Sequence, residues 1–232
     1  MNFGFTEEQN LLKDQVQRFM KEACPMTRVR EISASENAFD RTLWQQAADL
    51  GWLGLTIPES YGGLGLKWID LIVVLEAAAE GLSPLPIASH ALATSAIVAC
   101  ASDEQKARWL PAMASGEAVV TLGLYDEANW IDPAAITARA TVAGGKVSLQ
   151  GKKPFVNDAL AADYLLLAVQ GPDGLALAAV GRDQVQVAAQ PTIDSTKPMA
   201  SVDLTGAEID AAGLLPLSPE QLAFLTDCGG FA

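Results

Sequence analysis

Histidine, cysteine and basic side chains are scarce in this chain of 232 residues. Its one histidine, His90, cannot build a His-rich metal site, and it serves a Ser/His or Cys/His catalytic pair only if it is itself the base. Its three cysteines, Cys24, Cys100 and Cys228, are odd in number and far apart, which argues against a disulfide framework and a zinc ribbon. We therefore predict no metal site and a reducing compartment.

Cations and long apolar runs are also few. Lys and Arg number 15 against 28 Asp and Glu, and the formal net charge of −13 disfavours nucleic acid and anionic membranes as partners. The longest apolar stretches, residues 69–75 and 91–101, fall well short of the ~20 residues that cross a bilayer. The first residues carry Glu7 and Glu8 and no apolar core of signal-peptide length. We expect a soluble, cytoplasmic protein.

The first half of the chain has a helical pattern. Hydrophobic residues make up 50% of the sequence and charged ones 19%, enough for a sizeable core in one or two domains. Thr6 to Gln9 reads as a capping box that opens a helix, and Ser102 to Gln105 reads as a second one. Further helices are predicted over residues 41–50, 68–80 and 87–101.

From residue 119 the pattern changes to short β-branched or apolar runs, separated by turn residues such as Gly144-Gly145. We predict strands over residues 119–125, 136–142, 146–149, 164–169, 176–180 and 185–187, and a loop over 191–198. Strands of this length and spacing indicate an antiparallel barrel or sandwich of about 100 residues.

A last helix is predicted from Ser218-Pro219, because Pro is favoured at the first helical position. Leu222, Leu225 and Phe231 would form its apolar face, but it ends early and has little to pack on. We therefore expect a chain that lacks a third, helical part. The predicted fold class is α+β, with an all-helical domain over residues 1–118, a small antiparallel β-barrel or sandwich over 119–216, and the start of a C-terminal helical domain over 217–232.

The sequence contains few side chains that could carry out catalysis without a cofactor. His90 lies in an Ala-rich segment and is interpreted as a hydrogen-bonded structural residue, and the cysteines as small buried hydrophobes. Glu76 and Glu80 share one helix face and could form an acid/base pair or bind a metal; a solvated edge or separate ion pairs are the alternatives.

Redox chemistry on this chain would need a bound cofactor to supply the difficult step. Strand ends can offer backbone N–H groups to a flavin. Tyr125 and Phe155, at the ends of two predicted strands, could form an aromatic shelf for its ring, and ordinary packing of both rings is the alternative.

Recognisable motifs are spread over almost the whole chain. They are Phe5-Thr6-Glu7-Glu8-Gln9, Leu50-Gly51-Trp52-Leu53-Gly54-Leu55, Pro58-Glu59-Ser60-Tyr61-Gly62-Gly63-Leu64-Gly65, Glu104-Gln105-Lys106, Leu110-Pro111, Ser115-Gly116-Glu117, Leu149-Gln150-Gly151-Lys152-Lys153-Pro154-Phe155-Val156 and Ala162-Asp163. In this order and spacing they resemble the acyl-CoA dehydrogenase family, without most of its C-terminal helical domain. In the third motif, Gly62 and Gly63 would permit a tight turn that a Cβ blocks.

The resemblance implies an oxidoreductase of lipid metabolism that binds FAD and an acyl-CoA substrate. Members remove hydrogen from Cα and Cβ of the thioester, with a glutamate as the base and flavin N5 as the hydride acceptor. That glutamate belongs to the C-terminal bundle, so no residue of this chain is assigned as the catalytic base. The resemblance also implies a homo- or hetero-oligomer, a dimer or a tetramer.

The family motifs that frame the flavin place the cofactor site at Leu124, Tyr125, Ile131, Phe155, Val156 and Asn157. Three of these depart from the family pattern. Tyr125 stands where a small Thr is usual, Ile131 replaces a Ser hydroxyl, and Phe155 keeps an aromatic ring without an indole N–H. Asn157 keeps a donor and an acceptor near flavin N5.

These departures leave more than one hypothesis open. The first is an FAD-dependent acyl-CoA dehydrogenase, and the second is a non-catalytic subunit of the same fold that scaffolds an active partner. A different flavin chemistry, such as that of an oxidase or monooxygenase, is a third, because fold does not determine reaction.

The charge distribution predicts help from another subunit in holding the anionic cofactor and CoA. The local cations to consider for these phosphates are Lys152, Lys153 and Arg139. Solvation at the surface is the favoured role for each of them. The helix over residues 68–80 is expected to contribute to the acyl pocket, whose chain-length specificity the sequence does not reveal.

Overall fold

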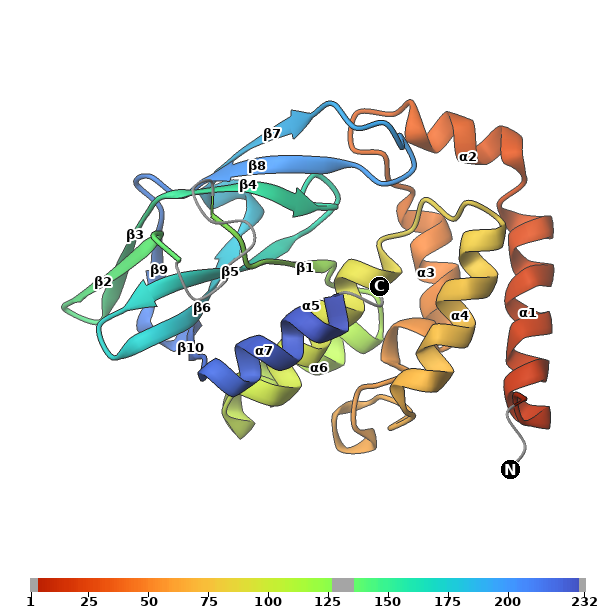
Figure 1. Ribbon diagram of the computed structural model, residues 1–232, viewed down its shortest axis with the longest axis horizontal. Coiled ribbons are helices and arrows are strands. Elements are labelled where there is room, and N and C mark those ends of the chain that lie inside the picture. The colour runs from red at the N-terminus through yellow and green to blue at the C-terminus, as the bar shows by residue number, and fades with distance from the viewer. Residues whose placement is uncertain (1–3, 127–135, 230–232) are drawn as a thin grey trace.

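Helices gather at one side of the molecule and strands at the other in the computed structural model, which describes residues 4–126 and 136–229 (Figure 1). The predicted fold class is confirmed, since a helical region is followed by a β region and then by the start of a further helix. The helices are α1 (Glu7–Ala23), α2 (Met26–Ser33), α3 (Arg41–Asp49), α4 (Trp68–Glu80), α5 (Ile87–Cys100), α6 (Asp103–Ala114) and α7 (Pro219–Gly229). Within the described residues, none of them is long and apolar enough to cross a membrane.

The helix starts that the sequence predicts are present. The Thr6 hydroxyl accepts from the Gln9 N–H at 3.2 Å, and the Gln9 side chain accepts from the Thr6 N–H at 3.0 Å. Ser102 and Gln105 make the same reciprocal pair at the start of α6. These bonds satisfy backbone donors that the first turn of a helix leaves free.

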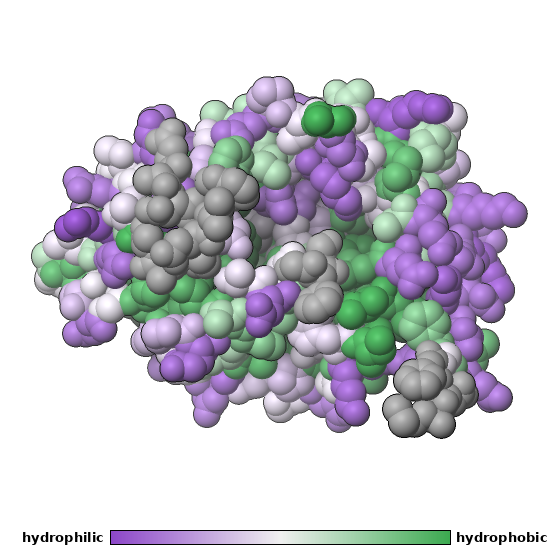
Figure 2. Space-filling model, in the orientation of Figure 1, coloured by the Kyte–Doolittle hydropathy of each residue, from purple (hydrophilic) through white to green (hydrophobic). Residues whose placement is uncertain are grey.

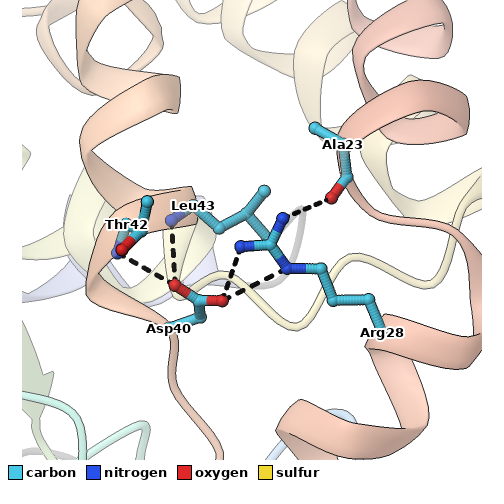
Figure 3. A network of polar contacts seen from close by, with 5 residues as sticks. All are labelled: Ala23, Arg28, Asp40, Thr42 and Leu43. Atoms are coloured by element: carbon cyan, nitrogen blue, oxygen red, sulfur yellow. Dashed lines mark hydrogen bonds and ion pairs between the residues drawn. The ribbon is translucent and has the colours of Figure 1, made fainter.

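Helix α2 was not predicted, and an ion pair holds it in place (Figure 3). Arg28 of α2 donates from Nη2 to Asp40 at 2.7 Å and from Nη1 to the Ala23 carbonyl oxygen at 2.8 Å. The other oxygen of Asp40 accepts from the N–H groups of Thr42 and Leu43 at the start of α3. One carboxylate and one guanidinium therefore join the end of α1, the short α2 and the start of α3.

The C-terminal helix does have a surface to pack on, so that expectation was wrong. Helix α7 lies along α5 (Figure 1), with Leu222, Leu225 and Cys228 buried. Gln221 of α7 also donates to the Ala99 carbonyl oxygen at 2.6 Å. Phe231, predicted for the same apolar face, lies outside the described residues.

The β region consists of two sheets. Their strands are β1 (Val120–Gly123), β2 (Arg139–Ala143), β3 (Lys146–Gln150), β4 (Lys152–Asn157), β5 (Tyr164–Gly171), β6 (Gly174–Gly181), β7 (Gln186–Gln190), β8 (Met199–Asp203), β9 (Glu208–Asp210) and β10 (Leu214–Pro216). One sheet has the order β10-β6-β5-β2-β3-β9, with β1 added against β5, and the other has the order β4-β8-β7. Most pairs are antiparallel, but β1 and β2 each pair with β5 in parallel, which the strand pattern did not predict.

Strand β1 connects the two regions. It packs against α5 and also lies between β5 and β4, where the Thr121 hydroxyl donates to the Asn157 carbonyl oxygen at 2.7 Å. A side chain at Gly123 would come within 2.7 Å of Leu167 and 2.9 Å of Val156. A Cβ at this position would therefore force the side chains of Leu167 and Val156 on the neighbouring strands to move.

His90 is the structural residue that the sequence predicted. Its Nδ1 accepts from the Val120 N–H at 3.3 Å, so the other ring nitrogen carries the proton and donates to the Met113 carbonyl oxygen at 3.2 Å. The ring thus joins α5, α6 and β1. Complete burial lowers the pKa of His90 from 6.5 to about 4 and keeps the ring neutral.

The Gly62-Gly63 turn has the geometry expected from the motif, but its two glycines differ in what they require. A Cβ on Gly63 would lie 2.1 Å from the Ile57 carbonyl oxygen, whereas a Cβ on Gly62 would meet nothing within 4 Å. Gly62 instead has a φ of +85°, which disfavours other residues.

The two positions provide a matched pair of variants. We expect Gly63→Ala to lower the free energy of unfolding by about 3 kcal/mol, because the backbone of residue 57 must move. Gly62→Ala should cost about 1 kcal/mol, the strain of a positive φ alone. Urea unfolding monitored by tryptophan fluorescence measures both, and equal losses would contradict this account of the turn.

His90 should make the protein less stable as the pH falls. The pKa of His90 is lower in the folded state than in the unfolded state. Its contribution to the free energy of unfolding is therefore complete above pH 6.5 and is lost as the pH falls toward 4. We expect a loss of about 2 kcal/mol from this residue between pH 7.5 and pH 5.

The test compares urea unfolding of the wild type and His90→Gln across this range. Because the chain has one histidine, the difference in slope between the two isolates its titration. Parallel pH profiles would show that the residue does not titrate on unfolding.

Candidate functional site

A bulge in β4 decides which of its side chains face the interior. The pairing of β4 with β8 shifts register between Lys153 and Val156, and Pro154 lies in the bulge, where its missing N–H is tolerated. Lys153 and Val156 are consequently both buried, although residues three positions apart in a regular strand face opposite sides, while Phe155 and Asn157 face outward. The predicted strand ranges did not include β4, although Phe155 was expected at a strand end.

The buried Lys153 is paired with Asp126, which directly follows Tyr125. Its ammonium donates to the Asp126 carboxylate and to the Leu124 carbonyl oxygen, the latter at 3.3 Å. The side chain of Lys153 is 0% exposed and that of Asp126 is 2% exposed. The interpretation of Lys153 as a solvated surface cation was therefore wrong, because the bulge turns its side chain inward.

Asp126 also holds the start of the next described segment. Its carboxylate accepts from the N–H of Ala138 and the hydroxyl of Thr137, both at 2.7 Å, and from the N–H of Thr137. Burial alone would raise the pKa of Asp126, but Lys153 and these donors outweigh it and hold the pKa below its usual value. Burial lowers the pKa of Lys153, and the carboxylate beside it opposes this. The pair fixes the end of β1 against β4.

Four of the six predicted cofactor residues lie on one cavity of about 400 Å³. They are Leu124, Tyr125, Phe155 and Asn157. Leu92 of α5 and Leu225 of α7 form part of the opposite wall. Val156 is fully buried in the core beneath this surface, and Ile131 lies outside the described residues.

The chemical character of this cavity comes from two outward-facing side chains of β4. Phe155 is 50% exposed and lines this cavity. The side-chain amide of Asn157 makes no hydrogen bond within the part of the chain that the structure describes, so its donors and acceptor are free. The site therefore offers a flat apolar surface beside an unpartnered amide.

A second, smaller cavity of about 230 Å³ adjoins the first. Leu92, Leu122, Asn157 and Gly229 line both cavities. In the smaller one the Ser89 hydroxyl of α5 donates to the Asp158 carboxylate, and both residues are buried. Burial raises the pKa of Asp158, while Ser89 and the nearby Lys197 oppose this rise.

Sequence reasoning missed this second cavity. Ser89, Asp158 and Lys197 belong to α5, to the residue after β4 and to the loop before β8, and no spacing rule connects such distant residues. Helix α4, which was expected to contribute to the acyl pocket, provides no residue to either cavity. Helix α5 contributes Leu92 to both cavities, and a role for α4 in an acyl pocket stays a prediction.

The other candidate residues have structural surroundings. Glu76 and Glu80 both pair with Lys13, at 3.0 and 3.3 Å, and are half-exposed, as expected for a solvated edge. Cys24 and Cys228 are buried and Cys100 is partly buried. Burial raises the pKa of Cys100 to about 11, so its thiol is not activated.

Two surface cations remain as predicted. Lys152 is exposed and pairs with Asp203 at 3.4 Å, and Arg139 is exposed on β2. Neither lines one of the two cavities.

Residues 6–117 match the family model described as "Acyl-CoA dehydrogenase, N-terminal domain". The chain is 31% identical over 169 residues to mitochondrial isovaleryl-CoA dehydrogenase of Pongo abelii. This alignment covers 71% of the present chain and 40% of the relative. It is 30% identical over 215 residues to acyl-CoA dehydrogenase FadE27 of Mycobacterium tuberculosis, covering 91% and 56% respectively. The chain thus spans about half the length of these relatives.

Two similar structures extend the match into the β region. The ChsE4-ChsE5 complex from Mycobacterium tuberculosis aligns with a TM-score of 0.86 and 27% identity, over 98% of this chain and 62% of that chain. A variant of the Tcur3481-Tcur3483 steroid ACAD aligns with a TM-score of 0.83 and 28% identity, over 96% and 60%.

The buried ion pair supports a stability prediction with an adjacent control. Lys153→Met should lower the free energy of unfolding by about 3–5 kcal/mol, because it leaves the Asp126 charge buried without its partner. The double variant Lys153→Met, Asp126→Asn should be less destabilised than the sum of the two single variants. Lys152→Met, which removes an exposed ion pair, should cost less than about 1 kcal/mol.

Urea unfolding of the wild type, Lys153→Met, Asp126→Asn and the double variant gives the coupling energy between Lys153 and Asp126. Additive effects of the two substitutions would refute a direct interaction between their charges.

Proposed function

The chain belongs to the acyl-CoA dehydrogenase family, and from this we propose that it contributes the flavin-contacting surface of an FAD-dependent dehydrogenase that acts on acyl-CoA thioesters. When bound, FAD would supply the acceptor for the hydride that leaves Cβ of the thioester. The catalytic base is not assigned to this chain.

The observation that carries the proposal is that Phe155 and Asn157 both line the larger cavity. An exposed aromatic ring suits the flat face of an isoalloxazine, and a free amide can both donate to and accept from its polar edge. Leu124 and Tyr125 would contact the same ring system, and Val156 would support it from the core. Ile131 remains a proposed contact from the sequence motif.

The two adjoining cavities support a position for the acyl group. With the flavin against Phe155 and Asn157, the smaller cavity beyond Asn157 would take the acyl chain. Leu85, Leu92 and Leu122 provide apolar wall for the hydrocarbon part of this chain.

The phosphates of FAD and CoA would be held partly by another subunit. The chain carries a net charge of −13, and its surface cations Lys152 and Arg139 line neither cavity. We accordingly propose a homo- or hetero-oligomer, and a division of the chain at residues 118 and 216 into helical, β and C-terminal helical parts.

A second candidate function is a non-catalytic subunit that supports an active partner. Two observations favour it. Tyr125 occupies part of the cavity wall where the family has a smaller Thr, and two similar structures carry the names of two components each, ChsE4-ChsE5 and Tcur3481-Tcur3483. Under this hypothesis the larger cavity would remain without flavin.

Flavin retention distinguishes the two candidates. The full-length protein, purified with its partner chain, should carry the visible absorbance of flavin and be bleached by an acyl-CoA. Phe155→Ala should weaken flavin binding about 10-fold, because the stacked ring is lost. Phe224→Ala removes another exposed ring, one that lies outside the cavity, and should leave flavin binding unchanged.

The second candidate makes the opposite prediction. A colourless protein that associates with a yellow partner would overturn the dehydrogenase proposal. Tyr125→Thr would then be expected to restore flavin binding, if the tyrosine ring is what excludes the cofactor.

A further inference from the structure

The smaller cavity combines an apolar lining with one buried polar corner. Ser89 and Asp158 are 7% and 6% exposed, and Leu85, Leu92 and Leu122 line the same space. Lys197 also lines it, from the loop before β8. A cavity that takes only hydrocarbon has no use for a buried carboxylate, because an unsatisfied buried charge is costly.

The carboxylate of Asp158 retains hydrogen-bonding capacity. Two carboxylate oxygens offer about four acceptor sites, and within the described residues only the Ser89 hydroxyl donates to them. The turn at this residue is held by its backbone instead. The Asp158 N–H donates to the Pro198 carbonyl oxygen at 2.9 Å, and the Asp158 carbonyl accepts from the N–H groups of Ala161 and Ala162.

Lys197 provides the complementary donor. Its Nζ donates to the Ser83 carbonyl oxygen at 3.1 Å, which leaves two of its three N–H bonds for other partners. Its charge also acts on Asp158, since it opposes the rise in the pKa of that carboxyl. The cavity therefore presents an acceptor and a donor to the same space.

We propose that the smaller cavity selects an acyl group that carries a hydroxyl, which donates to Asp158 and accepts from Lys197. The inference rests on the proposed function, because it takes this cavity as the place of the acyl chain. A hydroxyl satisfies both protein groups at once. A ketone could only accept, a carboxylate would face the charge of Asp158, and a plain hydrocarbon would leave the polar corner unsatisfied.

The test is a comparison of binding by isothermal titration calorimetry, with the full-length protein loaded with FAD. The probes are hexanoyl-CoA and the γ-, δ- and ε-hydroxyhexanoyl thioesters of CoA. At least one hydroxylated thioester should bind about 10- to 100-fold more tightly than hexanoyl-CoA. If none of the three binds more tightly, the inference is overturned while acyl-CoA binding stands.

Variants identify the groups responsible. Asp158→Asn should reduce the preference about tenfold, because a charge-assisted hydrogen bond becomes a neutral one. Asn also tolerates the φ of +56° at this position, so the fold should be retained. Lys197→Met should reduce the preference as well, because it removes the donor that this residue provides to the cavity.

The matched control is Ser95→Ala. Ser95 is a buried serine of the same helix as Ser89, but its hydroxyl donates to the Ala91 carbonyl oxygen and it lines a different cavity. The preference should be unchanged in this variant. A preference that survives both Asp158→Asn and Lys197→Met would refute the assignment of these two groups. If none of the four thioesters binds, both the proposed function and this inference are overturned.

Discussion

The buried pair of Lys153 and Asp126 is the constraint on which the rest of the candidate site depends. It joins the end of β1 to the bulge of β4, and its carboxylate also holds Thr137 and Ala138 at the entry to β2. Both charges lie out of contact with water. Separating them would therefore leave an uncompensated charge in the protein interior. Tyr125, just beyond the end of β1, and Phe155 of β4 consequently line one cavity.

A second constraint brings the helices to this β surface. Strand β1 packs on α5, and the neutral ring of His90 bonds to both β1 and α6. Gly123 allows β1 to approach β4 and β5 closely. As a result Leu92 of α5 and Asn157 of β4 line the same two cavities, which are formed between helices and strands instead of within either region. Binding sites at the contact of two structural regions are common, because neither region alone provides a concave surface.

Local patterns predicted much of the helical region and less of the β region. The capping boxes of Thr6 and Ser102 are read over four residues, and α4 was predicted with its observed bounds. Strand β4 was missed because Lys152, Lys153 and Pro154 are poor strand residues, and strands such as β9 and β10 are only three residues long. Helix α2 was missed because it has eight residues and no side-chain cap.

By itself, the sequence determined the fold class, the family resemblance, and the selection of Tyr125, Phe155 and Asn157, since these depend on short motifs and local spacing. Only the tertiary structure decided that Lys153 is buried and that Ser89 meets Asp158. The partners in these two contacts are 27 and 69 residues apart. Such pairs form because the packing of strands and helices removes their charged and polar groups from water together, and no local period in a sequence records which distant group will be the partner.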